Sequence, residues 1–130
     1  RADVDLFLYD LKLMDDERHR RFTGVSNAPV LRNLRRLSEL GHRIRLRFPV
    51  IPDVNDDEEN LRAVAAFAAG LPHLEGADLL PYHHSGADKY ERLDRTYRLP
   101  DARSPSEERL EVVARFLKGN GLAVGPGPGP

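Results

Sequence analysis

Charged and titratable side chains stand where each of three apolar runs of the sequence ends. Asp10 and Lys12 follow the first run, Arg47 ends the second, and His83 follows the third. A carboxylate, an ammonium group, a guanidinium fork and an imidazole can each contact a different polar group of a small ligand. We therefore treat these four residues as candidates for a ligand-binding site. No residue is predicted to be catalytic or to bind a metal ion.

Asp10 and Lys12 form a pair that could orient a ligand carrying both charges. The two-residue period of an extended chain places them on one face. A solvent-exposed ion pair is the alternative, and such pairs contribute little to stability. Only three of the twenty basic residues are lysine, namely Lys12, Lys89 and Lys118. This rarity favours a specific need for a compact ammonium group at position 12.

Three arginines alternate with apolar residues along the second run. The apolar face should pack beneath helices, and the arginine face should point into the interior of a barrel. A guanidinium there suits a carboxylate or a peptide carbonyl of a ligand. The alternative is an internal salt bridge to an acid on a neighbouring strand. The arginine face consists of Arg43, Arg45 and Arg47, and the apolar face of Ile44, Leu46 and Phe48.

Two adjacent histidines follow the third run, and the two-residue period lets only one of them share the inward direction. We choose His83 over His84. A histidine that only makes structural hydrogen bonds is the alternative. Adjacent histidines do not converge easily on one metal ion, so a metal site is the less favoured interpretation.

Two other polar features are interpreted as structural. The loop at 54–59 is rich in Asn, Asp and Glu, which are expected where a helix begins, and Asp56 with Glu59 has the spacing of a capping box. Six arginines lie among acids and are predicted on the solvent faces of helices: Arg18, Arg20, Arg21, Arg32, Arg35 and Arg36.

Strands and helices alternate along the predicted chain. Apolar runs predict strands at 4–9, 44–48 and 77–82, with Pro49 and Pro52 ending the second. This order predicts parallel strands with right-handed crossovers, an α/β fold. A three-stranded parallel sheet is small, and such sheets are buried on both faces. We therefore expect three consecutive β-α units of a larger parallel barrel, truncated before the first strand.

Helices are predicted from apolar residues at helical spacing and from their end signals. One spans 28–40, between a cap at Asn27 and a left-handed Gly41, and a second ends at Gly70. The last begins at Ser104 as N-cap and continues through Leu117. Alternating Gly and Pro at 125–130 predict a disordered tail after a domain at 1–124.

Composition excludes several classes of function. The 130 residues are 40% hydrophobic and 32% charged, and the net charge of -1 provides no overall attraction to nucleic acid or membranes. The sequence shows no apolar run long enough to span a bilayer and no signal peptide, so we expect a cytoplasmic protein. It contains no cysteine. A cysteine-bound iron–sulfur cluster within these residues is therefore excluded.

Five motifs, taken in order, resemble the glycyl-radical-enzyme activating enzymes, typified by pyruvate formate-lyase activating enzyme, of the radical S-adenosylmethionine (SAM) superfamily. The resemblance runs from about Asp5 to Val124. The chain departs from it at Asp53, where the family usually has glycine, and in the Gly-Pro tail. The motifs are Asp10-Leu11-Lys12, His19-x-x-Phe22-Thr23-Gly24-Val25-Ser26-Asn27, Arg47 before Pro49, Pro52-x-x-Asn55-Asp56, and Leu79-Leu80-Pro81-Tyr82-His83.

The resemblance implies a partial (β/α)6 barrel of radical SAM type, of which this chain supplies the C-terminal half. The N-terminal half would carry the Cys-x-x-x-Cys-x-x-Cys loop that binds a 4Fe-4S cluster. In the family, the reduced cluster cleaves SAM to a 5′-deoxyadenosyl radical, which removes a hydrogen atom from a glycine of the partner enzyme. Implied partners are a glycyl-radical enzyme such as pyruvate formate-lyase, the cluster-bearing half, and an electron donor such as flavodoxin.

The same resemblance implies roles for the candidate residues. Asp10, Lys12 and His83 would line the SAM site, and Arg47 would lie near the cofactor and the incoming glycine loop. The chain alone is expected to be inactive, because the cluster ligands are absent. Two alternatives stay open: a truncated module that binds a ligand without catalysis, and a fragment of a Schiff-base aldolase barrel that uses Lys12 as an amine nucleophile.

Overall fold

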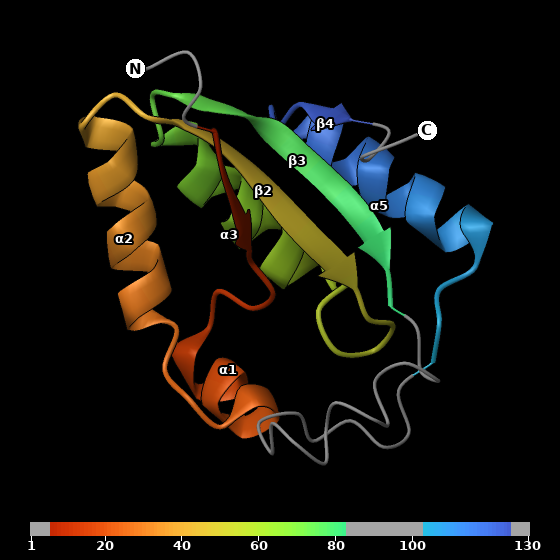
Figure 1. Cartoon of the computed structure of the whole chain (residues 1–130). Coiled ribbons are helices and arrows are strands. Elements are labelled where there is room, and N and C mark those ends of the chain that lie inside the picture. The colour runs from red at the N-terminus through yellow and green to blue at the C-terminus, as the bar shows by residue number, and fades with distance from the viewer. Residues whose placement is uncertain (1–5, 83–102, 126–130) are drawn as a thin grey trace.

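The chain folds into a parallel sheet with helices packed on one of its faces (Figure 1). The computed structural model describes residues 6–82 and 103–125. Its elements, in chain order, are β1 (Leu6–Asp10), α1 (Asp16–Thr23), α2 (Ala28–Glu39), β2 (Arg43–Val50), α3 (Glu58–Ala69), β3 (Leu74–Pro81), α5 (Glu107–Gly119) and β4 (Val124–Gly125).

The strand order β1-β2-β3-β4 follows the sequence, and every neighbouring pair is parallel. This confirms the predicted α/β class. The short β4 was not predicted: Gly125, assigned from the sequence to the tail, pairs with Asp78 of β3. Among the described residues, no helix is both long and apolar enough to cross a bilayer.

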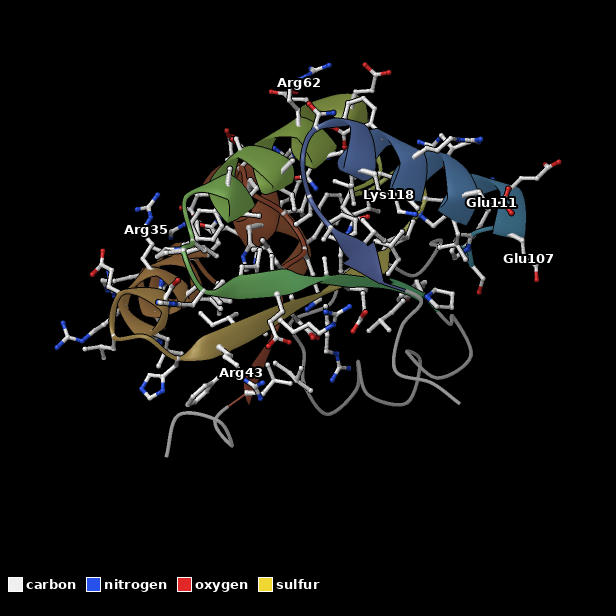
Figure 2. The ribbon with its side chains drawn as sticks, turned by 90° about the horizontal axis from the view of Figure 1, so that it is seen from above. Arg35, Arg43, Arg62, Glu107, Glu111 and Lys118 are labelled. Atoms are coloured by element: carbon white, nitrogen blue, oxygen red, sulfur yellow. The ribbon has the colours of Figure 1, made fainter. Side chains whose placement is uncertain are left out.

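The core lies between the sheet and its helices, and the alternation along β2 determines which side chains enter it. Ile44, Leu46, Phe48 and Val50 are at most 1% exposed, whereas the residues between them are partly exposed. Figure 2 shows α3 and α5 on one side of the sheet and Arg43 on the other. The predicted division of β2 into an apolar and an arginine face is therefore confirmed. Helical core partners include Leu34, Leu61, Val64, Val113 and Leu117.

Pro49 lies inside β2 and does not end it, contrary to the sequence prediction. Leu11 N donates to Arg47 O at 2.9 Å, and the chain after β1 then leaves the sheet. Successive backbone groups of a strand point to alternate sides, so the nitrogen of Pro49 faces the side where β1 has already ended. Its missing N–H therefore removes no ladder bond, which explains why proline is tolerated there.

Two helix caps differ by one or two residues from the prediction. Asp57, not Asp56, caps α3 by accepting from Asn60 N at 3.0 Å. Ser106, not Ser104, caps α5 by accepting from Arg109 N at 3.0 Å. Asp56 is unavailable because its carboxylate accepts from Arg109 Nε at 2.8 Å. Tertiary contacts thus decide which of several capping residues is used.

The loop after β2 turns through an aspartate in a left-handed conformation. Asp53 has a φ of 69°, and Val54 N donates to Ile51 O across it at 3.0 Å. Proline followed by a residue of positive φ is the pattern of a type II turn. Glycine adopts this conformation without a Cβ penalty. Asp53, with its carboxylate in an exposed ion pair to Arg103, therefore occupies a glycine position.

We predict that Asp53→Gly stabilises the chain by about 1 kcal/mol, because it removes the left-handed strain and sacrifices only an exposed ion pair. Asp53→Asn is the matched control, since asparagine tolerates positive φ and lacks the charge; it should leave stability nearly unchanged. Urea unfolding measures both variants. A loss of stability in Asp53→Gly would show that the ion pair with Arg103 outweighs the backbone strain.

Candidate functional site

Acidic and basic side chains alternate across the strands on one face of the sheet, which we call the helix-free face because no helix of the described residues packs on it (Figure 2). The register pairs Asp10 of β1 with Arg47 of β2, and Arg47 with Asp78 of β3. Paired residues of parallel strands point to the same side, so these charges meet on one face. Each β2 arginine finds an acid on a neighbouring strand: Arg43 with Glu75 at 3.4 Å, Arg45 with Asp78 at 2.7 Å, and Arg47 with Asp10 at 3.3 Å.

The central pair of this ladder is the most enclosed. Arg45 donates from Nε and Nη2 to the two carboxylate oxygens of Asp78 at 2.8 and 2.7 Å. The Asp78 side chain is 7% exposed. These hydrogen bonds raise the pKa of Arg45, which therefore stays charged at any ordinary pH. Nε and Nη2 of Arg45 and both oxygens of Asp78 are engaged with each other, and at 23% exposure the Arg45 side chain is less accessible than that of Arg47 at 43%.

Two glycines make room for the Arg45 guanidinium. A Cβ on Gly125 would overlap Arg45 Nη2, and a Cβ on Gly76 would lie 2.9 Å from the carbonyl oxygen of Ala123. Backbone of β3 and β4 can therefore approach the ion pair closely. This contact gives a physical reason for Gly125 to lie in β4.

Asp10, Lys12 and Arg47 come together at the C-terminal edge of the ladder. Asp10 lies 3.3 Å from Arg47 Nε and 3.9 Å from Lys12 Nζ, so one carboxylate is shared by two cations. The exposed fractions are 47% for Asp10, 43% for Arg47 and 19% for Lys12. The trio carries a net positive charge, and its contacts are longer than those of the central pair. It can therefore accept a ligand group of either sign.

Arg47 forms an ion pair with an acid on a neighbouring strand, which was the alternative interpretation in the sequence analysis. This pair does not exhaust the guanidinium, which has five N–H donors. His83, the fourth candidate, lies outside the described residues. The first described range ends at Tyr82, whose N–H donates to Val50 O at 3.3 Å.

Arg18 was predicted on a solvent face but joins α1 to the start of α3. Its guanidinium donates to both carboxylate oxygens of Asp57, at 2.8 and 3.3 Å, and to Val54 O. The contact lowers the pKa of Asp57 and raises that of Arg18. Asp16 similarly accepts from Arg20, Asn27 N and Ser26, which lowers its pKa to about 2. Both carboxylates therefore stay charged well into the acid range.

Three buried asparagines near the site were missed by sequence reasoning: Asn27, Asn55 and Asn60. Asn27 was predicted to cap α2, yet its side chain donates instead to Leu13 O and Met14 O, at 3.1 and 2.9 Å. Asn55 carried a further signal as part of the Pro52-x-x-Asn55-Asp56 motif, whereas Asn60 only stands near a helix start, where Asn is expected anyway. Within the described ranges, no three His, Cys, Asp or Glu side chains converge as metal ligands.

The chain is similar to proteins that activate other enzymes. It is 42% identical over 116 residues to the trans-4-hydroxy-L-proline dehydratase activating enzyme of Clostridioides difficile, covering 88% of this chain and 38% of that protein. A crystal structure of a domain of the pyruvate-formate lyase-activating enzyme from Bacteroides vulgatus matches with a TM-score of 0.74 and 35% identity, over 93% of this chain and 66% of that one. No family model matches.

A radical SAM methyltransferase from Sphaerobacter thermophilus shares the fold, with a TM-score of 0.62 and 18% identity over 91% of this chain and 32% of that one. At this identity the likeness concerns the fold alone. The chain spans less than half the length of the curated relatives it matches, 38 to 47% of the first of them.

We predict that Arg45→Met destabilises the chain by about 3 kcal/mol, because Asp78 would be left buried without its cation. Arg43→Met is the matched control: it removes the same group from the same strand face, but from a pair whose side chains are 43% and 37% exposed. Its cost should stay below about 1 kcal/mol. Urea unfolding distinguishes the two, and equal losses would contradict the enclosed character of the central pair.

Proposed function

The chain is a homologue of the glycyl-radical-enzyme activating enzymes of the radical SAM superfamily, and on this premise we propose that it forms the C-terminal portion of such an enzyme. The parent protein would generate a glycyl radical on a partner enzyme. The observation that carries this proposal is the combination of 42% identity to an activating enzyme with a helix-free sheet face whose charges gather near the strand exits.

The helix-free face is proposed to line the interior of a partial barrel. The helices already cover the apolar face of the sheet, so the opposite face, with its ion pairs, would be enclosed only by further strands and helices. In parallel α/β barrels, ligands bind at the C-terminal ends of the strands. Asp10 ends β1 and Lys12 follows it, whereas Arg47 lies opposite Asp10 within β2, which continues to Val50, so Arg47 stands before the strand exit and not at it as the sequence predicted.

These side chains suit SAM, which carries an amino acid group, a sulfonium, ribose hydroxyls and adenine. Lys12 and Arg47 can donate to its carboxylate, and Asp10 can accept from its ammonium or hydroxyl groups. The fit rests on the exposed, net-positive trio near the strand exits. His83 is proposed as a fourth contact on the family motif alone. The 4Fe-4S cluster does not fit this chain, which has no cysteine, and would be bound elsewhere in the parent protein.

When bound together, SAM and the cluster supply the radical chemistry, and the protein's task is to position the reacting groups. Lys12 and Arg47 would hold the cofactor's charged end against the strand exits. Arg47, which is more exposed than Lys12, would also donate to a carbonyl of the incoming glycine segment. Arg45 is less suited, because its Nε and Nη2 already donate to Asp78 and its side chain is less exposed than that of Arg47.

Partners are proposed on the same basis. They are a glycyl-radical enzyme, the cluster-bearing portion of the parent protein, and a reductant such as flavodoxin. The names of the similar proteins refer to two different target enzymes, a dehydratase and pyruvate-formate lyase. The choice of target is therefore proposed to depend on residues outside the shared motifs.

The proposed function is tested on the complete parent protein, purified anaerobically. We expect a four-iron cluster, cleavage of SAM on reduction, and a glycyl radical detected by electron paramagnetic resonance on the partner enzyme. The present chain alone should assemble no such cluster, since it has no thiolate to hold one. Stoichiometric cluster assembly on this chain, or a parent protein that neither binds iron nor cleaves SAM, would contradict the proposal.

In the complete protein, we predict that Arg47→Lys lowers glycyl-radical yield roughly tenfold to a hundredfold, because lysine keeps the charge but loses the fork geometry. Arg43→Lys is the control, as Arg43 shares the strand face but lies at the opposite end of β2. It should retain near-normal activity, and melting temperatures should differ little between the variants. Similar yields from both variants would remove Arg47 from the site.

A further inference from the structure

Buried asparagine side chains surround the C-terminal edge of the sheet, next to the candidate site. Asn55 is fully buried and Asn60 is 2% exposed. A buried amide is unfavourable unless its donors and acceptor are bonded, so the partners of these side chains indicate what they do. In both cases most of the partners are backbone groups at a strand exit.

Asn60, in the first turn of α3, holds the segment that follows β1. Its Oδ1 accepts from Met14 N at 2.9 Å, and its Nδ2 donates to Lys12 O at 3.1 Å and to Asn55 O at 2.9 Å. An amide offers one acceptor and two donor hydrogens, and all are used here. The bonds to Lys12 and Met14 flank Leu13 on either side.

This geometry reproduces the pairing of a parallel strand. In a parallel ladder, one residue donates to the carbonyl before its opposite number and accepts from the N–H after it. The Asn60 amide does the same around Leu13. Since β1 ends at Asp10 and Leu11 N bonds Arg47 O of β2, the side chain of Asn60 bonds the backbone of the segment that follows, at Lys12 and Met14.

Asn55 repeats the arrangement at the exit of β2. Its Nδ2 donates to Pro49 O at 2.7 Å, and its Oδ1 accepts from Ile51 N at 2.9 Å, around Val50. The bond from Asn60 Nδ2 to Asn55 O joins the two arrangements. One chain of hydrogen bonds therefore links the exit that carries Lys12 to the strand that carries Arg47.

We propose that Asn60 is a positioning residue for the ligand site, which sets the place of Lys12 relative to Arg47 by holding the Lys12 carbonyl. The inference rests on the proposed function. Asn60 touches no ligand itself and acts through the backbone of Lys12. Aspartate has the same shape but lacks the Nδ2 donor, and serine is too short to reach both sides of Leu13, so only asparagine supplies the set of bonds.

The test uses the complete parent protein with its cluster, and its main readout is the Kd for SAM by anaerobic equilibrium dialysis. Asn60→Asp should raise this Kd about tenfold or more, since small displacements of a binding group have effects of that size. Asn60→Ser is the second variant, in case the aspartate prevents folding. Ser38→Ala is the control. Ser38 is fully buried, and its Oγ accepts from His73 N at 3.0 Å near the N-terminal end of β3, at the opposite end of the strands from the candidate site.

A double-substitution cycle separates positioning from general destabilisation. In a Lys12→Met background, Asn60→Asp should change the Kd for SAM less than about twofold, because the group it positions is gone. Ser38→Ala should leave the Kd unchanged in both backgrounds, even where it lowers the melting temperature.

An unchanged Kd in a folded Asn60 variant, or equal effects with and without Lys12, would overturn the positioning role while leaving the proposed function intact. If the unsubstituted protein binds no SAM, the proposed function fails and this inference fails with it.

Discussion

A guanidinium on the inner face of a sheet must meet an acid or reach water, because a charge that loses its hydration without a partner is strongly unfavourable. Three arginines of β2 face this requirement, because the other face of the strand is buried in the core and the arginines cannot turn toward it. A one-residue slip would exchange the arginines with the buried apolar residues. The acids of β1 and β3 therefore have to lie on the same face as the arginines: Asp10 and Asp78 both stand opposite Arg47, and Asp78 bonds Arg45 diagonally.

The ion pairs that result differ in exposure along β2. The enclosed central pair serves the structure, and the more exposed pair belongs to the candidate site. Arg45 and Asp78 form two short bonds beneath the backbone of β4 and satisfy each other. Arg47 shares Asp10 with Lys12 through longer, more exposed contacts, which leaves donors for a ligand. The same motif, an arginine beside an acid, is thus closed in the middle of the sheet and partly exposed at the candidate site.

At the ends of β1 and β2 the chain leaves the sheet, and within 6–82 and 103–125 no further strand pairs with these ends, so their backbone groups need other partners. Side-chain amides meet this need. Asn60 bonds the backbone that follows β1, and Asn55 bonds the backbone at the end of β2. The ion pair of Arg18 with Asp57 attaches α1 to the same region. The site residues are therefore supported by hydrogen bonds from α3 and from the loop before it. The apolar core supports the same segment directly, since Leu11 and Leu13 on either side of Lys12 are buried.

The sequence by itself determined the parallel α/β order, the buried face of β2 and the shared position of Asp10 and Lys12 after β1, because periodicity depends only on local geometry. It also determined that no cluster ligand is present, since this is a matter of composition. The pairing of Arg45 with Asp78, the use of Asp57 and Ser106 as caps, the continuation of β2 through Pro49 and the roles of Asn55 and Asn60 were decided by tertiary structure alone. Each depends on which groups from distant segments come into contact. A residue type such as Asn, Asp or Ser suits a cap, a turn or a buried hydrogen bond equally well, so its identity does not indicate which of these contacts forms.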